Sequence, residues 1–260
     1  FLKIKNGTRE AYNSYCLTQD LDFTGYDFSK TTLSVRYALI EGNDKRLLNL
    51  RLPAQQALFS SLRNVTIRNL KIGHPDFSNG IALSKSPSGI LAKSFNQSAL
   101  QNLELTGFTT SEPELASVSC GVLFGRVQDS TLRGISIRSN NDLNFQCTSL
   151  GIVAHVIENE KAGVVENVSL SLGGKIKVQT IRTMGVLSPS GFVFNLSKLQ
   201  LDVKDLEVEA DATKQNSFGV IMAHNRYSFG DISKIEFTDI SVKANVKLKN
   251  INGAGGMISD

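Results

Sequence analysis

The sequence predicts an all-β fold, a right-handed parallel β-helix in which coils of about 30 to 37 residues stack as a solenoid. Two apolar phrases recur along the chain with one shared period, and no long stretch has helical spacing. The chain has 260 residues, of which 41% are hydrophobic, so it can bury a large core.

The first recurring phrase is a hexapeptide with apolar residues at its first, fourth and sixth positions, where strict alternation would use the first, third and fifth. The copies are LRNVTI, LQNLEL, LRGISI, VENVSL, LSKLQL and ISKIEF, starting at residues 62, 100, 132, 165, 196 and 232. The gaps between these starts are 38, 32, 33, 31 and 36 residues. Self-similarity at such a period is typical of solenoids, propellers and arrays.

The second phrase begins with glycine and keeps step with the first. It recurs at Gly89, Gly121, Gly151, Gly185, Gly219 and Gly256. A propeller blade needs four antiparallel strands and usually more residues. A β-helix coil needs only two or three short strands, each pairing with its equivalent in the next coil, so the period favours a β-helix.

The extra residue within each hexapeptide is expected to turn a corner of the coil, so that both flanking strands still point their apolar residues inward. The predicted corner positions are Asn64, Asn102, Gly134, Asn167, Lys198 and Lys234. Glycine and asparagine tolerate the left-handed backbone that corners often need. Stacked asparagines are expected to form a hydrogen-bonded ladder, which Gly134 would interrupt.

We expect one continuous solenoid domain, with opening coils over residues 1–56 and repeated coils over 57–260. The chain starts at Phe1 and stops inside a patterned segment, which indicates a piece of a longer polypeptide, truncated at its C-terminal end. The period drifts, so the intervening segments are predicted to be unequal loops and the best places for partner contact. They are residues 73–88, 107–119, 139–148 and 244–253.

The N-terminal part carries phrases of a known family. YCLTQDLDFTGYDF (15–28) and ALIEGNDKRLLNLRL (38–52) precede ALFSSLRNVTIRNLKI (57–72) and CGVLFGRVQDSTLRGISI (120–137). This order resembles bacterial surface proteins with GLUG-type repeats, although the copies after Gly151 lack the second glycine of GVLFG. The resemblance implies a right-handed β-helix in a large extracellular or cell-envelope protein, often an adhesin. Similar repeats occur in non-catalytic regions of streptococcal immunoglobulin A proteases.

Three cysteines are too few for a disulfide scaffold, and none lies in a Cys-x-x-Cys motif. Cys120 and Cys147 are 27 residues apart, close to the length of one coil, so neighbouring coils could bring them within disulfide reach. They are expected either to form this bridge or to remain buried free thiols. Cys16 would be unpaired in both cases.

Few residues indicate chemistry. Asp20 and Asp22 share one face of a strand and could bind a cation or act as paired carboxylates, but the opening phrase of the first coil explains them better. The histidines His74, His155 and His224 do not fall in register, and no zinc motif occurs. Five glycosylation sequons occur at Asn6, Asn64, Asn96, Asn167 and Asn195, and the solenoid pattern itself accounts for two of them. We expect no catalytic residue, metal or cofactor.

The net charge is +4, and acidic residues interleave with basic ones. The predicted outward charges are Arg63, Arg68, Arg133, Arg138, Lys198, Lys234, Glu104, Glu166 and Glu236. A basic wall could meet an anionic glycan or a membrane surface, but the interleaved acids favour a solvated mixed-charge face. No arginine-rich run or aromatic-basic patch indicates nucleic acid. No apolar run reaches the roughly 18 residues of a membrane span.

The predicted function is a non-catalytic stalk or display module of a larger bacterial surface or envelope protein, mediating adhesion or assembly. Its partner would be a protein or glycan on a host or neighbouring cell, or another part of the same envelope assembly. The alternative is an accessory or substrate-binding region of a large secreted protease or glycan-active enzyme whose active site lies elsewhere in the protein.

Overall fold

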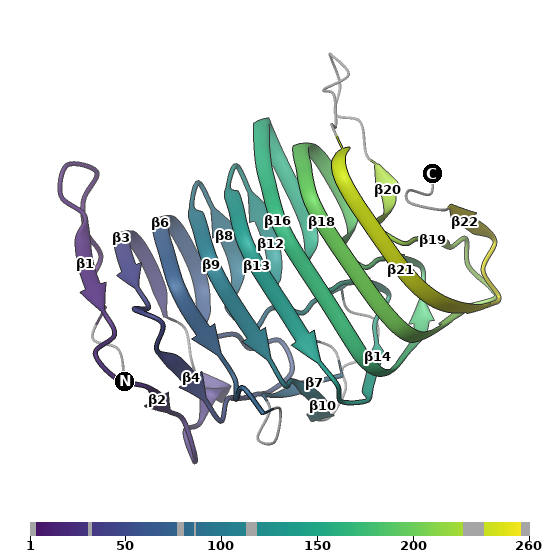
Figure 1. Cartoon of the computed structure of the whole chain (residues 1–260), viewed down its shortest axis with the longest axis horizontal. Coiled ribbons are helices and arrows are strands. Elements are labelled where there is room, and N and C mark those ends of the chain that lie inside the picture. The colour runs from purple at the N-terminus through teal and green to yellow at the C-terminus, as the bar shows by residue number, and fades with distance from the viewer. Residues whose placement is uncertain are drawn as a thin grey trace.

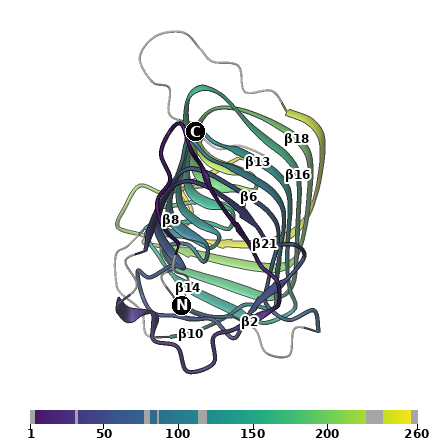
Figure 2. The same cartoon turned by 90° about the vertical axis from the view of Figure 1, so that its left-hand side faces the viewer.

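The computed structural model describes residues 4–30, 33–76, 81–85, 87–112, 119–225 and 237–255. Over these residues the chain winds into stacked coils (Figure 1), and the coils nest behind one another when viewed along the stack (Figure 2). The strand pairings between coils are parallel throughout the described ranges. A single 3₁₀ turn, η1 (Phe28–Lys30), interrupts the strands there. The prediction of an all-β parallel solenoid is confirmed.

The strands form three parallel sheets within the described residues. The largest bends around the corners and contains β1 (Asn13–Cys16), β2 (Leu21–Asp22), β3 (Ser34–Glu41), β4 (Arg46–Leu48), β6 (Phe59–Ile72), β8 (Ala92–Asn96), β9 (Ala99–Thr106), β12 (Phe124–Gln128), β13 (Thr131–Ser139), β14 (Leu143–Gln146), β16 (Ala154–Ile181), β18 (Ser188–Ala210), β20 (Met222–Asn225) and β21 (Phe237–Lys249). The second contains β5 (Arg51–Leu52), β7 (Ala82–Ser84) and β10 (Thr109–Glu112). The third contains β11 (Ser119–Gly121), β15 (Ser149–Gly151), β17 (Thr183–Gly185), β19 (Ser217–Gly219) and β22 (Gly253–Gly255).

One central coil runs through β11, β12, β13 and β14, and the next begins with β15. This central coil has four strands rather than the predicted two or three, because the glycine phrase forms a short strand of its own, β11. Gly121 lies opposite Gly151, and the same row continues through Gly185 and Gly219. The row ends at Gly255, not at the predicted Gly256, which lies outside the described residues.

The core consists of apolar rows that run along the stack. Each inward position of one coil rests on the same position of the next, and the side chains in two such rows are no more than 1% exposed. These rows are Leu62, Phe95, Val127 and Ile157, and Ile67, Leu100, Leu132, Val165 and Leu196. Fully burying one such side chain contributes about 1.5–3 kcal/mol, so stacking of neighbouring coils provides most of the stability.

The five predicted corners within the described residues adopt left-handed backbone conformations, but Asn64 belongs to a different corner from Asn102. Asn69, not Asn64, lies opposite Asn102. This corner row has φ angles of 54° to 65° and comprises Asn69, Asn102, Gly134, Asn167, Lys198 and Asp239. Asn64, with φ of 53°, lies opposite Tyr37 in the preceding corner row.

The misalignment has a simple cause. Strand β6 holds two overlapping copies of the hexapeptide, LRNVTI and IRNLKI, which share Ile67. Both place apolar residues at the first, fourth and sixth positions, so spacing alone does not tell which copy matches the next coil. The same ambiguity arises near residue 237, because Phe237 rather than Ile232 lies opposite Leu196. The predicted corner Lys234 falls outside the described residues, and Asp239 takes its place opposite Lys198.

An asparagine ladder is present where the corner row holds two asparagines in succession, but it runs through Asn69 and not through the predicted Asn64. Asn102 Nδ2 donates a hydrogen bond of 3.0 Å to Asn69 Oδ1, and Asn69 Nδ2 donates to Glu41 Oε1 at 2.9 Å. The next position is Gly134, which has no side chain to continue the ladder. The ladder therefore ends at the residue where the sequence predicts the interruption.

The corner row leads to a stability prediction at Asn102. We expect Asn102→Ala to lower the free energy of unfolding by about 1–2 kcal/mol, because alanine is strained at a φ of 56° and cannot bond to Asn69. Asn102→Gly keeps the backbone freedom and is expected to lose less. Urea titration followed by circular dichroism measures both, with Gln101→Ala on the outward face as the control. Equal losses for alanine and glycine would contradict a role for the left-handed backbone.

Each of the four segments predicted to be loops contains part or all of a strand among its described residues. Residues 139–148 contain β14, 244–253 contain the end of β21, and the two earlier segments contain β7 and β10. In β14, Leu143 and Phe145 are buried while Asn144 and Gln146 are half-buried, so this short segment is a strand that alternates inward and outward. Such four-residue runs are too short for periodicity to distinguish them from loops.

Candidate binding surface

The outward side chains of the coils pair with one another along the stack. Most ion pairs join neighbouring coils, as between Arg133 Nε and Glu166 Oε2 at 3.2 Å or Lys175 Nζ and Glu207 Oε2 at 2.9 Å. The other pairs are Arg46–Glu104, Arg68–Glu41, Lys71–Asp44, Arg126–Glu158, Arg138–Glu104, Lys198–Glu166, Lys247–Asp205 and Lys249–Glu209. The walls are therefore mixed-charge faces in which many of the described charges have a partner of opposite sign.

Several glutamates act as shared acceptors, and Glu166, for example, pairs with both Arg133 and Lys198. Glu104 accepts from Arg46 at 2.9 Å and faces Arg138 at 3.6 Å, although Arg46 and Glu104 are two coils apart. Glu41 is also enclosed: burial raises its pKa, but hydrogen bonds from the Asn69 amide, the Asn43 N–H and Arg68 outweigh this and hold the pKa below its usual value. These carboxylates are thus committed to holding the coils together rather than to binding a ligand.

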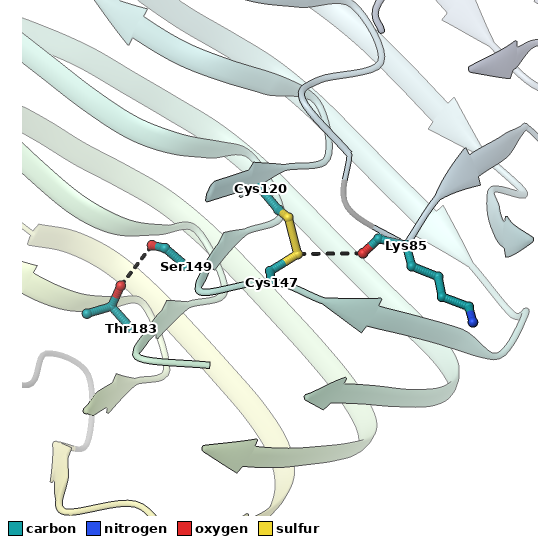
Figure 3. Close-up of a disulfide and its surroundings, with 5 residues drawn as sticks. All are labelled: Lys85, Cys120, Cys147, Ser149 and Thr183. Atoms are coloured by element: carbon teal, nitrogen blue, oxygen red, sulfur yellow. Dashed lines mark hydrogen bonds between the residues drawn. A yellow bond between two sulfur atoms is a disulfide. The ribbon is translucent and has the colours of Figure 1, made fainter. Parts of the chain in front are cut away.

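A disulfide joins Cys120 and Cys147, the pair singled out from the sequence (Figure 3). Their Cα atoms are 6.0 Å apart, and both residues are fully buried. Cys120 lies on β11 opposite Leu150 on β15. Cys147 precedes Leu150 by three residues, and the bend before β15 brings it next to Cys120. The sulfur of Cys147 is 3.6 Å from the carbonyl oxygen of Lys85, a contact rather than a hydrogen bond, because a bridged sulfur carries no hydrogen. Cys16 is a free, exposed thiol on edge strand β1.

A hydroxyl pair lies beside the disulfide in the same sheet. Ser149 Oγ and Thr183 Oγ1 are 2.8 Å apart on adjacent strands β15 and β17 (Figure 3). Ser149 is buried, so this hydrogen bond satisfies polar atoms that would otherwise be costly to enclose. The disulfide region is therefore a packed structural element.

Asp20 and Asp22 line a shallow hollow of about 480 Å³ at the N-terminal coil, formed by residues 19–26. Asp20 Oδ1 accepts the backbone N–H of Arg46 at 2.8 Å. Asp22 Oδ1 accepts from the Asn49 amide and from Thr24, and these hydrogen bonds hold the pKa of Asp22 below its ordinary value. Both carboxylates thus fix the first coil to the second, in agreement with the structural interpretation of the Asp-x-Asp pair.

His155 and His224 do not share a register position along the stack. His224 lies opposite Ser190, which in turn lies opposite Val156. His155 precedes Val156 by one residue and lies opposite Gly125, so the two histidines are not in register. Burial lowers the pKa of His155, which keeps its imidazole neutral at pH 7. Within the described ranges, no three His, Cys, Asp or Glu side chains gather in a way that would hold a metal ion.

Sequence reasoning missed one group of surface residues near the N-terminus. Alternation places Arg63 on an outward position, but no recurring phrase marks Arg36 and Tyr37 on the neighbouring coil or Tyr12, which packs against Tyr37. Strand β3, which carries Arg36 and Tyr37, lacks the hexapeptide, so only the three-dimensional register shows that Arg36 and Arg63 lie opposite each other. The alternation of Ser34, Val35 and Arg36 was the available signal, since it matches Ser61, Leu62 and Arg63.

Among the described residues, no helix has the length and apolar character needed to cross a membrane. No protein-family model matches the sequence, and a comparison with curated proteins finds no match. The fold and the arrangement of surface residues are therefore the observations on which a functional proposal must rest.

Proposed function

We propose that the chain is a non-catalytic display or stalk module of a larger bacterial surface or envelope protein, mediating adhesion or assembly. The observation that supports this most directly is the buried disulfide between Cys120 and Cys147. Disulfides persist in oxidising compartments such as the cell exterior and are rare in the reducing cytosol. The resemblance of the N-terminal phrases to GLUG-type surface proteins points the same way.

The arrangement of the coils suits a rigid spacer. Consecutive coils are joined by ladders of backbone hydrogen bonds, apolar rows and ion pairs, so each coil is fixed to the next. A solenoid of this kind holds lateral surfaces in a set order along its length. Its partner would be a protein or glycan on a host or neighbouring cell, or another component of the same envelope assembly.

The free thiol of Cys16 gives a direct test of the location. Intact cells that naturally produce the protein are treated with a membrane-impermeant maleimide and then analysed by peptide mass mapping. We expect Cys16 to be labelled before lysis, because it is exposed, and Cys120 and Cys147 to remain unlabelled until reductant is added. Labelling of Cys16 only after lysis would overturn the proposal of a surface protein.

The non-catalytic part of the proposal needs a separate experiment. The purified chain is incubated with polysaccharides and with immunoglobulin A, and products are followed by reducing-sugar assay, by absorbance of unsaturated sugars and by gel electrophoresis. We expect no cleavage. Product formation by the chain alone would replace the display module with an enzyme.

A further inference from the structure

Two arginines on neighbouring coils lie opposite each other without an ionic partner. Arg36 on β3 and Arg63 on β6 are in register, and both are exposed. Neither guanidinium forms an ion pair with any residue that the structure describes. Elsewhere, in-register charges often alternate in sign, as in the succession Arg133 and Glu166. Arg46 and Lys71 are also in register, but each has an ionic partner, Glu104 and Asp44 respectively.

The arrangement has an electrostatic cost. The backbones of neighbouring strands are about 4.8 Å apart, so the register places two like charges on adjacent side chains, where they repel each other even though solvent screens them. The next residues in the same row are the neutral amides Asn96 and Gln128, so no carboxylate on the adjacent coils relieves the repulsion. The nearest acid in the row, Glu158, is paired with Arg126. A bound anion would compensate both arginines.

A row of hydroxyls runs parallel to the arginines on the same face. Ser34, Ser61 and Ser94 are in register on three successive coils. Each lies two residues before Arg36, Arg63 or Asn96, with a buried residue in between, so serines and charged residues point to the same side. The face therefore carries hydroxyl groups at regular intervals along the stack, of which Ser34 Oγ shares a hydrogen bond of 2.7 Å with Ser60 Oγ.

An aromatic pair, exposed Tyr12 and half-buried Tyr37, borders Arg36. Tyr37 follows it at the corner, with φ of 51°, and packs edge-on against Tyr12 with ring centroids 5.7 Å apart. Tyr12 is 50% exposed, which is unusual for a large ring that could be buried. Tyrosine rings offer an apolar face beside a polar tip, and this suits contact with the C–H face of a sugar ring.

We propose that Tyr12, Ser34, Arg36, Ser61 and Arg63 form a binding surface for an acidic polysaccharide, whose carboxylate or sulfate groups bridge the two arginines. Arginine binds such groups through two parallel hydrogen bonds. The donors follow the axis of the stack across successive coils and lie on an open face, so an extended polymer fits them better than a small anion. The inference rests on the proposed function, because it names the ligand class of the display module.

The test measures binding of the purified full chain to sodium polygalacturonate, heparin, neutral dextran, duplex DNA and anionic lipid vesicles by biolayer interferometry. We expect binding to polygalacturonate or heparin that weakens with salt, and none to dextran. The double variant Arg36→Gln/Arg63→Gln is expected to lose at least about tenfold per arginine in affinity. Tyr12→Ala is expected to weaken binding without changing its salt dependence.

The matched control is Arg68→Gln/Arg133→Gln, which removes the same charge from two arginines paired with Glu41 and Glu166. The control is expected to change the affinity by no more than about twofold. If general electrostatic attraction alone caused binding, both double variants would lose affinity equally. The Arg36/Arg63 variant should be at least as stable as the wild type, which excludes misfolding as the reason for lost binding.

Absence of binding to both acidic polysaccharides would overturn the proposal, and so would equal losses in the two double variants. Binding of DNA or vesicles as tight as that of the polysaccharides would also overturn it, in favour of a general anion surface. None of these results bears on the labelling of Cys16 on intact cells, so failure of this inference is distinguishable from failure of the proposed function.

Discussion

Replacing Gly121 with alanine is expected to lower the free energy of unfolding by about 3 kcal/mol or more. A Cβ atom on Gly121 would lie 1.8 Å from the carbonyl oxygen of Phe124 and 2.7 Å from the backbone nitrogen of His155. Both are backbone atoms held by the pairing of β12 with β16, so neither can move without breaking that pairing. The substitution thus forces adjacent coils apart.

The same close approach recurs along the glycine row, which is why the effect should be large. The Cβ of an alanine at Gly151 would lie 2.0 Å from the carbonyl oxygen of Ala154, and one at Gly185 would lie 2.2 Å from that of Ser188. In each coil the chain folds back against the third residue after the glycine. The glycine phrase is therefore explained by the lack of room for a Cβ atom at each copy, and not by backbone dihedral angles alone.

Urea titration followed by circular dichroism measures the effect, and Ser119→Ala is the matched control. Ser119 lies on the same short strand as Gly121 but is exposed, so its replacement is expected to change the free energy of unfolding by less than about 0.5 kcal/mol. A Gly121→Ala protein as stable as the control would show that the coils can separate at this strand without loss of pairing.

The repeat period was predictable because each coil buries two recurring phrases, and each phrase shows the period independently. The hexapeptide and the glycine phrase each occupy one place in the coil, so their agreement identified the solenoid and most equivalent residues. The exact register at Asn64 was not predictable, because LRNVTI and IRNLKI satisfy the same apolar pattern. Only the pairing of Arg68 with Gln101 and Leu70 with Leu103 decides between them.

The proposed polysaccharide surface was predictable only in part. Arg63 was placed on the outward face from alternation alone. Its apposition to Arg36 depends on a coil offset of 27 residues between β3 and β6, shorter than the period of the repeated coils. Tyr12 reaches Tyr37 through a turn at residues 8–11 that no recurring phrase marks. Surface sites of this kind lie where the chain departs from the repeat. A search for recurring patterns therefore does not detect them.

Removing the disulfide is the second substitution with a large expected effect. Cys120→Ala/Cys147→Ala opens a loop of 27 residues, which by the loop-closure relation lowers the free energy of unfolding by about 3.5 kcal/mol. Both residues are fully buried, so each alanine also leaves unfilled space within the core. The midpoint of urea unfolding should fall accordingly, and Cys16→Ala, at an exposed site, should leave it unchanged.

Reductant separates the covalent effect from the packing effect. Unfolding the wild type in the presence of a phosphine reductant should lower its midpoint towards that of the double alanine variant, whereas the variant itself should not respond. The remaining difference between reduced wild type and variant then measures the packing of the two side chains. If all three cysteines of the unreduced, unfolded wild type react with iodoacetamide, the bridge is absent and the argument for an oxidising compartment loses its main support.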